Sequence, residues 1–283
     1  MAQFVDSFNS EYHTAVEGMS ALPKPMNEAW IMTNEIVKNL YSNYNISGNN
    51  KNLMQFCRTS VEKYIFGKIY SRLFEMYQLK YQEEDKLFQE RSITTMTTDP
   101  VSMLKHLGVN KKFIIWDRFK FSNSESKYEF KNKLHEGSEN SSNISESESA
   151  SDYSTPRQEP RNWDDNLIPY HESIKALERI SSYTSPREKL DWIIDFFSNM
   201  KASIVDFWKG KVELTTMDDI LPLCIYWVWY CNSQNFVSEI NLIKDFINIA
   251  GDEATDSLER TLVNIEMGIQ YVSTTDEFPF DTS

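Results

Sequence analysis

The feature that most constrains the fold of this chain is a helical spacing of apolar residues that recurs along most of its length. Apolar side chains follow one another at intervals of three or four residues, which places them on one face of an α-helix. Three segments show the pattern: Phe66, Ile69, Tyr70, Leu73, Phe74 and Tyr77; then Leu190, Ile193, Ile194 and Phe197; then Leu258, Leu262, Ile265, Ile269 and Val272. Because 283 residues suffice to bury one sizeable core, the pattern predicts an all-α, layered multi-helix bundle.

Two further helices are predicted with more detail. In the stretch that begins at Ser185, the Ser185 side chain is expected to accept from the backbone N–H of Glu188. Pro186 suits the first helical position, and Glu188 completes a capping box. An N-terminal helix is predicted from the segment "MNEAWIMTNEIVKNLY". Its apolar face would be formed by Trp30, Ile31, Ile36, Val37 and Leu40.

One long stretch breaks the helical pattern. Residues 121–166 are rich in Ser, Asn and Glu and contain no periodic apolar stripe. Such a composition buries too little apolar surface to offset the entropy of ordering, so the stretch is predicted to be a disordered acidic insertion. Its acidic serine strings are candidates for phosphorylation, and the alternative is a solvated loop without a regulatory role.

The overall charge excludes some classes of partner. The formal net charge is −13, and no basic stripe interrupts it, so neither nucleic acid nor unaided binding to anionic lipid is expected. No apolar, Arg-led presequence opens the chain. The odd count of three cysteines, Cys57, Cys224 and Cys231, without a C-x-x-C pair, is typical of cytosolic thiols.

The segment "TTMDDILPLCIYWVWYC" at 215–231 combines two adjacent carboxylates with an uncharged aromatic run. The run from Ile220 to Cys231 holds about 12 residues, whereas a membrane span needs roughly 20. No transmembrane segment is therefore predicted. The aromatic content alone would suit a strand, but the acidic start and Pro222, tolerable in a first turn, favour a buried helix. On this basis Asp218 and Asp219 are read as a helix cap or as acid groups at a working edge.

A search for catalytic motifs finds none. The four histidines lie far apart, and no H-E-x-x-H or C-x-x-C pattern suggests a metal site. Neither a G-x-S-x-G elbow nor a phosphate-binding G-x-x-x-x-G-K-[ST] loop occurs. We therefore expect no metal, no cofactor and no covalent catalysis.

Several short stretches nevertheless stand in a characteristic order. The stretch at 170–197 contains Ser185, Pro186, Lys189 and Leu190 in Ser-Pro-x-x-Lys-Leu spacing, and Asp218, Asp219 and Pro222 form an Asp-Asp-x-x-Pro motif followed by Asn232. The others are "VEKYIFGKIYSRLF" at 61–74, "QERSI" at 89–93, "FVSEINLIKDF" at 236–246 and "LVNIEMGIQYV" at 262–272. In this order they resemble the Vacuolar Protein Sorting nine (VPS-nine) domain family, guanine nucleotide exchange modules for Rab-five-type small GTPases.

The resemblance implies a division of the chain. A VPS-nine-like exchange domain would occupy 61–120 and 167–275, split by the insertion at 121–166. Residues 1–60 would be an N-terminal helical support segment, and 276–283 a tail. By the same resemblance the protein would be cytoplasmic, associated peripherally with endosomal membranes through a recruiting protein partner, and active in endosomal and vacuolar vesicle trafficking.

The resemblance also assigns roles to residues. Asp218, the first Asp of the motif, would act as an acidic finger in the nucleotide site of the GTPase. There it would compete with the nucleotide phosphates for Mg²⁺ and for the phosphate-loop lysine. Asp219 and Pro222 would cap and fix the helix, and Arg260, Val263 and Asn264 would contact the GTPase.

Two positions depart from the family pattern. A family Tyr is replaced by Arg260, and a family Thr by Val263. Arg260 would then either face an acidic GTPase surface or pair with Asp256 one turn earlier. Three functions remain open on sequence: an exchange factor, a catalytically weak module that binds or scaffolds a GTPase, and a structural helical protein in which Asp218 is only a cap.

Overall fold

The computed structural model describes residues 2–44, 46, 51–95, 99–115, 169–251 and 256–275. The insertion predicted at 121–166 and the tail at 276–283 lie outside these residues. No strand occurs in the described part, which confirms the all-α prediction. Its helices are α1 (Ala2–Glu11), α2 (Ala15–Ala21), α3 (Lys24–Asn43), α4 (Lys51–Lys80), α5 (Gln82–Thr95), α6 (Pro100–His106), η1 (Lys111–Phe113), α8 (His171–Glu178), η3 (Arg179–Ser182), α9 (Pro186–Phe207), α10 (Met217–Tyr230), α11 (Phe236–Ala250) and α12 (Asp256–Thr274).

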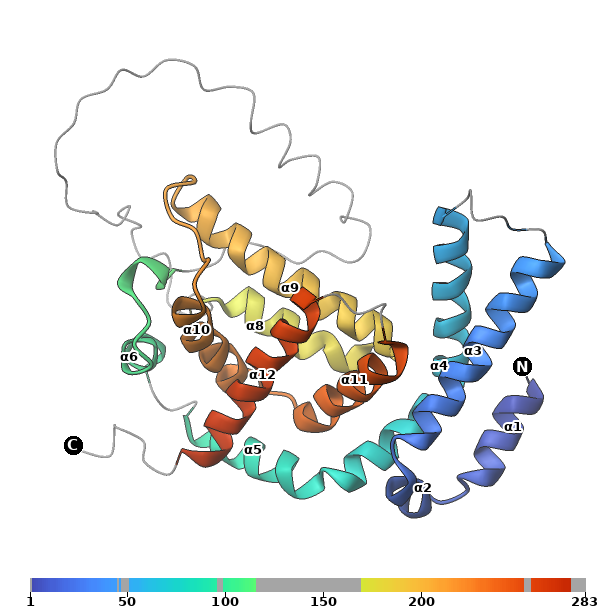
Figure 1. The fold of residues 1–283 in the computed structure, drawn as a ribbon. Helices are drawn as coiled ribbons and strands as arrows, with labels where there is room; N and C mark the ends of the chain where they lie inside the picture. Colours follow the sequence, from blue (N-terminus) through green and yellow to red (C-terminus); the bar gives the residue numbers. More distant parts are fainter. Residues whose placement is uncertain are drawn as a thin grey trace.

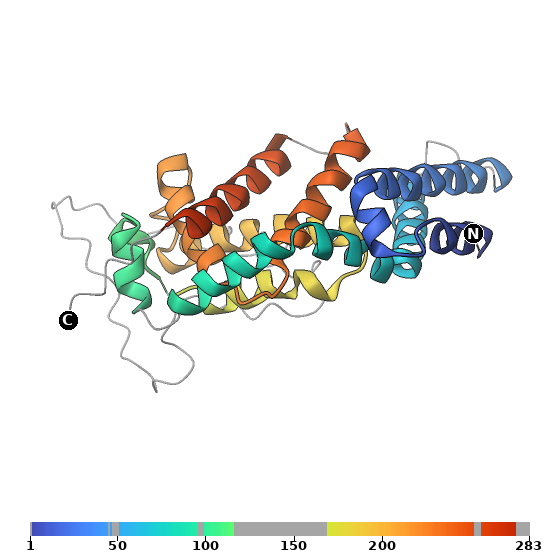
Figure 2. The same ribbon diagram turned by 90° about the horizontal axis from the view of Figure 1, so that it is seen from below.

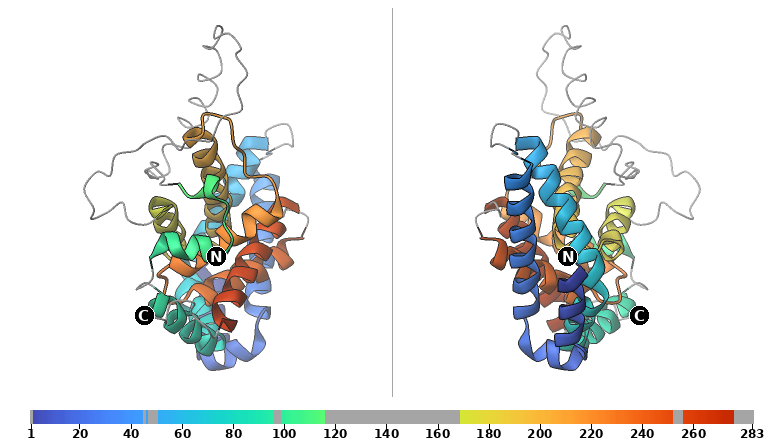
Figure 3. Two further views of the ribbon diagram at one scale, coloured as in Figure 1. Left: turned by 90° about the vertical axis from the view of Figure 1, so that its left-hand side faces the viewer. Right: turned by 90° about the vertical axis from the view of Figure 1, so that its right-hand side faces the viewer.

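The helices form two groups that share α4 (Figure 1). One group is an N-terminal layer, in which α1, α2 and α3 pack on α4, and the right-hand view of Figure 3 shows this layer in front of the remaining helices. The other group contains α5 and α8 to α12. Seen from below, α5 runs from the N-terminal layer toward α6 (Figure 2). The boundary expected between residues 60 and 61 lies within the continuous helix α4.

The periodic apolar residues form the core, as the spacing predicts. Phe66, Ile69, Leu73 and Tyr77 of α4 are completely buried, and so are the inner residues of α9 and α11. The N-terminal layer is attached through Trp30, whose ring lies 5.4 Å from that of Phe246 on α11. The expected apolar face of α3 is wrong at one position, because Ile31 is 49% exposed.

An ionic cluster joins the two groups beside Trp30. The Arg187 Nε atom of α9 donates to Oε2 of the buried Glu62 on α4 at 2.6 Å. The guanidinium groups of Arg187 and Arg58 lie over the Trp30 ring, 6.0 and 5.3 Å from its centroid. A charge taken out of water is costly unless it is paired and hydrogen-bonded, and Glu62 meets this condition.

A second buried ion pair holds α9 against α11. The Lys189 Nζ atom lies 2.7 Å from Glu239 Oε2, and it also donates to the Ile180 carbonyl at 3.0 Å. Both side chains are fully buried, and the Tyr70 hydroxyl donates to the second oxygen of Glu239 at 3.1 Å. Burial lowers the pKa of Lys189 and raises the pKa of Glu239. Lys189 of the Ser-Pro-x-x-Lys-Leu signature is therefore a core residue rather than a surface contact.

The capping box predicted at Ser185 is wrong. Helix α9 does begin at Pro186 with Ser185 as its N-cap, but the buried Ser185 side chain makes no capping hydrogen bond. Glu188 instead pairs with Lys63 of α4 at 2.8 Å. An ion pair between α4 and α9 has thus replaced the predicted hydrogen bonds of the capping box.

Candidate functional site

The aromatic segment after Asp218 forms helix α10, as predicted, and nearly all of this helix is buried. Its residues from Leu223 to Tyr230 are inaccessible on every side, and Cys224 and Cys231 are buried free thiols. The ring of Trp227 lies between those of Tyr170 and Phe196, 5.6 and 5.7 Å away. In the described part of the chain, no helix has the length and apolar content that a membrane crossing requires.

The first turn of α10 is fixed by a reciprocal cap that involves Thr216 and Asp219. The Thr216 hydroxyl oxygen accepts from the backbone N–H of Asp219 at 3.3 Å, and the hydroxyl donates to Asp219 Oδ2 at 2.6 Å. Thr216 is therefore the N-cap residue, and Asp219 stabilises it from the third helical position. Asp219 thus takes part in the cap, and its expected contact with the GTPase stays a prediction.

Asp218 is left free by this arrangement. It is the second residue of α10, its side chain is exposed, and it makes no hydrogen bond or ion pair within the described residues. Asp218 is thus not the hydrogen-bonding cap of the helix. Its carboxylate projects from the end of a buried, rigid helix with all of its acceptor capacity available.

Pro222 lies further into the helix than expected. It is the sixth residue of α10 and half-buried, whereas the sequence placed it in a first turn. Proline lacks the N–H that would bond to the carbonyl four residues earlier, which here belongs to Asp218. The Asp218 backbone is consequently less tied into the helix than its neighbours are.

Helix α12 packs against α10 and presents an exposed stripe on its outer side. Arg260 is exposed, and Val263 and Met267 are 49% and 42% exposed. These positions are separated by three and four residues and therefore lie on one face. Asn264 does not belong to this stripe, since it is buried and its Oδ1 atom has no hydrogen-bond partner in the described structure. The Asp256 side chain, the alternative partner of Arg260, lies outside the described residues.

The contact between α10 and α12 is close. A Cβ atom at Gly268 would come within 3.0 Å of a Val228 methyl group, and the rings of Trp229 and Tyr271 lie 5.7 Å apart. The exposed stripe of α12 is thereby held at a fixed distance from α10. Figure 1 shows the two helices crossing next to each other.

Sequence reasoning missed two exposed apolar residues at this site. Met217, immediately before Asp218, is 50% exposed, and Met267 extends the stripe that contains Val263. The spacing of Met267 from Val263 was a usable signal, but a Met in an amphipathic helix is more often a core residue. Asn232 is exposed beyond the far end of α10, where its backbone N–H donates to Glu178 at 3.0 Å.

The site offers acid and apolar groups but no arrangement for metal binding. Among the described residues, no group of three or more His, Cys, Asp and Glu side chains is placed to hold a metal ion. The arrangement is suited to contact with another macromolecule, because the exposed Asp218 follows the exposed Met217 directly in sequence, and the neighbouring helix α12 has an exposed apolar stripe of its own.

Comparison with known proteins agrees with the order of motifs. Residues 170–277 match the profile of the Vacuolar sorting protein 9 (VPS9) domain family. The mouse (Mus musculus) ALS2 C-terminal-like protein is 25% identical over 185 residues, and mouse Alsin is 23% identical over 184 residues. Each alignment covers 65% of this chain, but it covers only 16% and 9% of the length of these relatives. The matched region begins one residue before α8 and includes α8 to α12, so this part of the chain is similar to a VPS9 domain.

Proposed function

We propose that this chain is a guanine nucleotide exchange factor for a small GTPase of the Rab-five type, with Asp218 as its acidic finger. The observation that carries the proposal is the state of Asp218. Its carboxylate is exposed and uncommitted, while Thr216 and Asp219 fix the helix end that bears it.

The mechanism requires no covalent step. A carboxylate inserted next to the β-phosphate of GDP repels that phosphate and competes with it for Mg²⁺ and for the phosphate-loop lysine. Two unit charges 4 Å apart interact by about 4 kcal/mol at an effective dielectric constant of about 20. A change of this size corresponds to roughly a thousandfold faster release of nucleotide.

The exposed apolar residues would provide the docking contact. Met217, Val263 and Met267 lie on α10 and α12, which pack directly against each other. Exposed apolar groups near a charged residue are typical of protein interfaces. We assign Arg260 to the same contact, facing an acidic group of the GTPase. We further propose that a protein partner recruits the chain to endosomal membranes for vesicle trafficking.

The test is the release of a fluorescent GDP analogue from a panel of Rab-five-type GTPases. The wild-type chain should accelerate release from at least one of them, and Asp218→Asn should reduce the acceleration at least a hundredfold without changing the unfolding midpoint. Asp6→Asn on α1, which removes the same charge from another exposed Asp, should behave as wild type. Equal rates for wild type and Asp218→Asn would contradict the role of Asp218.

Arg260 favours a second candidate function. A cation at the position of a family Tyr suits a module that binds its GTPase without releasing nucleotide. Such a module would form a complex with the nucleotide-free GTPase and leave the rate of GDP release unchanged. Arg260→Tyr would then raise the rate, whereas in an active exchange factor it would lower the rate, because the contact of Arg260 with the GTPase is lost.

A further inference from the structure

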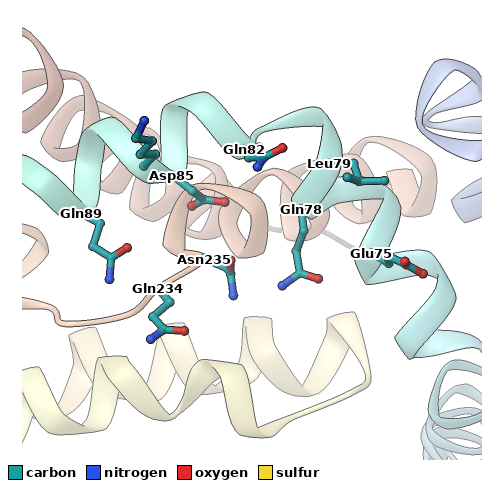
Figure 4. Close-up of a pocket in the computed structure, with 9 residues that line it drawn as sticks. Glu75, Gln78, Leu79, Gln82, Asp85, Gln89, Gln234 and Asn235 are labelled. Carbon is teal, nitrogen blue, oxygen red and sulfur yellow. The ribbon is translucent and has the colours of Figure 1, made fainter. Parts of the chain in front are cut away.

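A polar groove lies at the junction of α4 and α5, against the loop that leads into α11. Its volume is about 490 Å³, within the range of roughly 300–1000 Å³ that is usual for ligand-binding clefts. The residues that line it are mostly polar: Glu75, Gln78, Leu79, Gln82, Asp85, Lys86, Gln89, Gln234 and Asn235 (Figure 4).

The α4–α5 wall of the groove is one continuous helical face. Its residues follow each other at intervals of three and four, and the helical hydrogen-bond pattern continues through Tyr81, which separates the two helices. The backbone N–H of Tyr81 donates to Tyr77 at 2.9 Å, and that of Asp85 donates to Tyr81 at 2.8 Å. The chain bends where α4 meets α5 (Figure 4), so from Glu75 to Gln89 the face spans at most roughly 21 Å, the length of about six extended residues.

The groove is lined by carboxamides that the fold does not use. None of the side chains of Gln78, Gln82, Gln89, Gln234 and Asn235 makes a hydrogen bond within the described residues. In Figure 4, Gln78, Gln89, Gln234 and Asn235 extend to the same side. Each carboxamide offers two donors and one acceptor. This wall can therefore satisfy a ligand that alternates donors and acceptors.

Asp85 explains why Asn235 is free. Asn235 occupies the N-cap position of α11 but makes no capping hydrogen bond. The buried Asp85 of α5 takes that role, because its Oδ1 atom accepts from the backbone N–H groups of Val237 and Ser238 at 2.8 and 3.3 Å. Its other oxygen accepts from the Ser238 hydroxyl. The N-terminus of α11 is thus already occupied, so it does not provide an anion site.

The chemistry of the lining narrows the class of ligand. Leu79 is its one apolar side chain, and the other apolar atoms of the lining belong to polar residues, so an apolar ligand would also cover polar groups. Lys86 is its one cation, so a phosphate or other polyanion is also a poor match. Glu75 and Lys86 carry opposite charges eleven positions apart, at most roughly 16 Å along the helix. Glu75 also pairs with Arg72 one turn earlier at 2.9 Å, and both side chains are solvent-accessible, so a basic group of a ligand has to share or replace this pair. Oligosaccharide hydroxyls would match the carboxamides but not these two charges.

We propose that this groove binds an extended peptide segment of a partner protein through its main-chain amides. The carboxamides pair with backbone N–H and C=O groups of the peptide. The peptide carries a basic residue that reaches Glu75 and an acidic residue, about five positions away, that reaches Lys86. The groove adjoins the C-terminal end of α10, whereas Asp218 stands at the other end of this fourteen-residue helix, about 20 Å away. A peptide bound there would leave the Asp218 site open.

The test begins with the selection of random heptapeptides, displayed on phage, against the immobilised full-length chain. Enriched peptides should carry one basic and one acidic residue about five positions apart, with variable residues between them. In fluorescence anisotropy, Gln78→Ala/Gln234→Ala should weaken their binding at least tenfold. Gln55→Ala, at an exposed carboxamide in the first half of α4, should leave the binding unchanged.

Two further measurements separate main-chain recognition from other modes. N-methylation of the central peptide amides should weaken binding at least tenfold, whereas alanine at the central side chains should change it less than threefold. The double variant Glu75→Lys/Lys86→Glu should select peptides with the order of charges reversed. All groove variants should retain the wild-type rate of GDP release. Failure of the peptide-binding proposal is therefore distinguishable from failure of the proposed exchange function.

Three results would overturn the proposal. One is the absence of any enriched heptapeptide, and another is binding that the groove variants do not change. The third is selective binding of a neutral oligosaccharide such as maltoheptaose in place of peptides, which would assign the groove to a different class of ligand.

Discussion

At the scale of single residues, the start of α10 divides two adjacent carboxylates into different roles. Asp219 stabilises the helix through Thr216, and Asp218 is uncommitted. The residues alone left a cap or a working edge open for both, and only the resemblance assigned the cap to Asp219 and the finger to Asp218. That distinction depends on where the helix begins, and Thr216 rather than either Asp is the N-cap.

The cap can be tested separately from the role proposed for Asp218. Thr216→Ala should lower the free energy of unfolding by about 1 kcal/mol, because a buried helix loses the acceptor for its first turn. Thr216→Ser should retain most of the stability. Thr215→Ala, at an exposed neighbour outside the cap, should have no effect on the urea unfolding midpoint. An equal loss for Thr215→Ala and Thr216→Ala would contradict the capping role.

Asn264 shows the limit of carrying a role over by position. The resemblance places it among the GTPase contacts, but it lies one position from the exposed stripe of Arg260, Val263 and Met267 and is buried. A shift of one residue on a helix turns a side chain by about 100°. Apolar spacing predicted the inner face of α12. The outer face contains Met267 and Val263, which are apolar and therefore gave no indication that they are exposed.

At the scale of helices, the spacing of α12 from α10 depends on Gly268. Gly268→Ala should destabilise the protein by about 1–3 kcal/mol, since the new methyl group would meet Val228 at 3.0 Å. Val228 is completely buried, and its β-branched side chain has little freedom to move aside. The melting temperature should fall, and the proposed acceleration of GDP release should fall with it, because α12 is displaced from α10.

Gly67 provides the matched control on α4. A Cβ atom there would lie 3.7 Å from the Thr184 hydroxyl, which is an ordinary contact. Gly67→Ala should therefore stabilise the protein by roughly 0.5–1 kcal/mol, because alanine is the better helix former. If both substitutions shift the melting temperature in the same direction, the close approach at Gly268 does not determine the packing of the two helices.

The helices themselves were largely predictable, and their tertiary polar contacts were not. Apolar spacing located α3, α4, α9 and α12, and the acidic start with Pro222 favoured a helix for α10. Helices α1 and α2 were not predicted, although Phe4, Val5 and Phe8 of the first helix already have helical spacing. The groove was also missed. Its walls come from residues far apart in sequence, and Asp85 and Ser238 are 153 positions apart.

At the scale of the whole molecule, buried acidic protons make the fold sensitive to alkali. Burial raises the pKa values of Tyr70, Tyr77 and Tyr230, and those of the Cys224 and Cys231 thiols. A raised pKa means that the folded state holds the proton after the unfolded state has lost it. This contribution to stability is complete below the unfolded pKa, near 9 for Cys and 10 for Tyr, and is lost as the pH rises above that value.

The urea midpoint should therefore fall between pH 8 and pH 11. Each fully buried Tyr should contribute about 1.4 kcal/mol per pH unit above 10. Lys189 opposes the trend, since its lowered pKa makes the folded state release a proton first. Tyr77→Phe should cost about 1 kcal/mol at pH 8 through its lost hydrogen bond to Asp245, but it should flatten the alkaline decline. An unchanged midpoint up to pH 11 would contradict this account.

Helix α4 has a consequence for the order in which the molecule assembles. Its contacts with α2 and α3 lie within the first 80 residues, so this layer can form before the later helices are synthesised. The other face of α4 packs against helices that come much later in the chain. For example, Tyr77 of α4 and its hydrogen-bond partner Asp245 are 168 residues apart. At a synthesis rate of about 5–20 residues per second, that interval is roughly 8 to 34 seconds. During translation, the apolar face of α4 that later packs against α11 is thus exposed for this time, and we expect chaperones to bind it until the core forms.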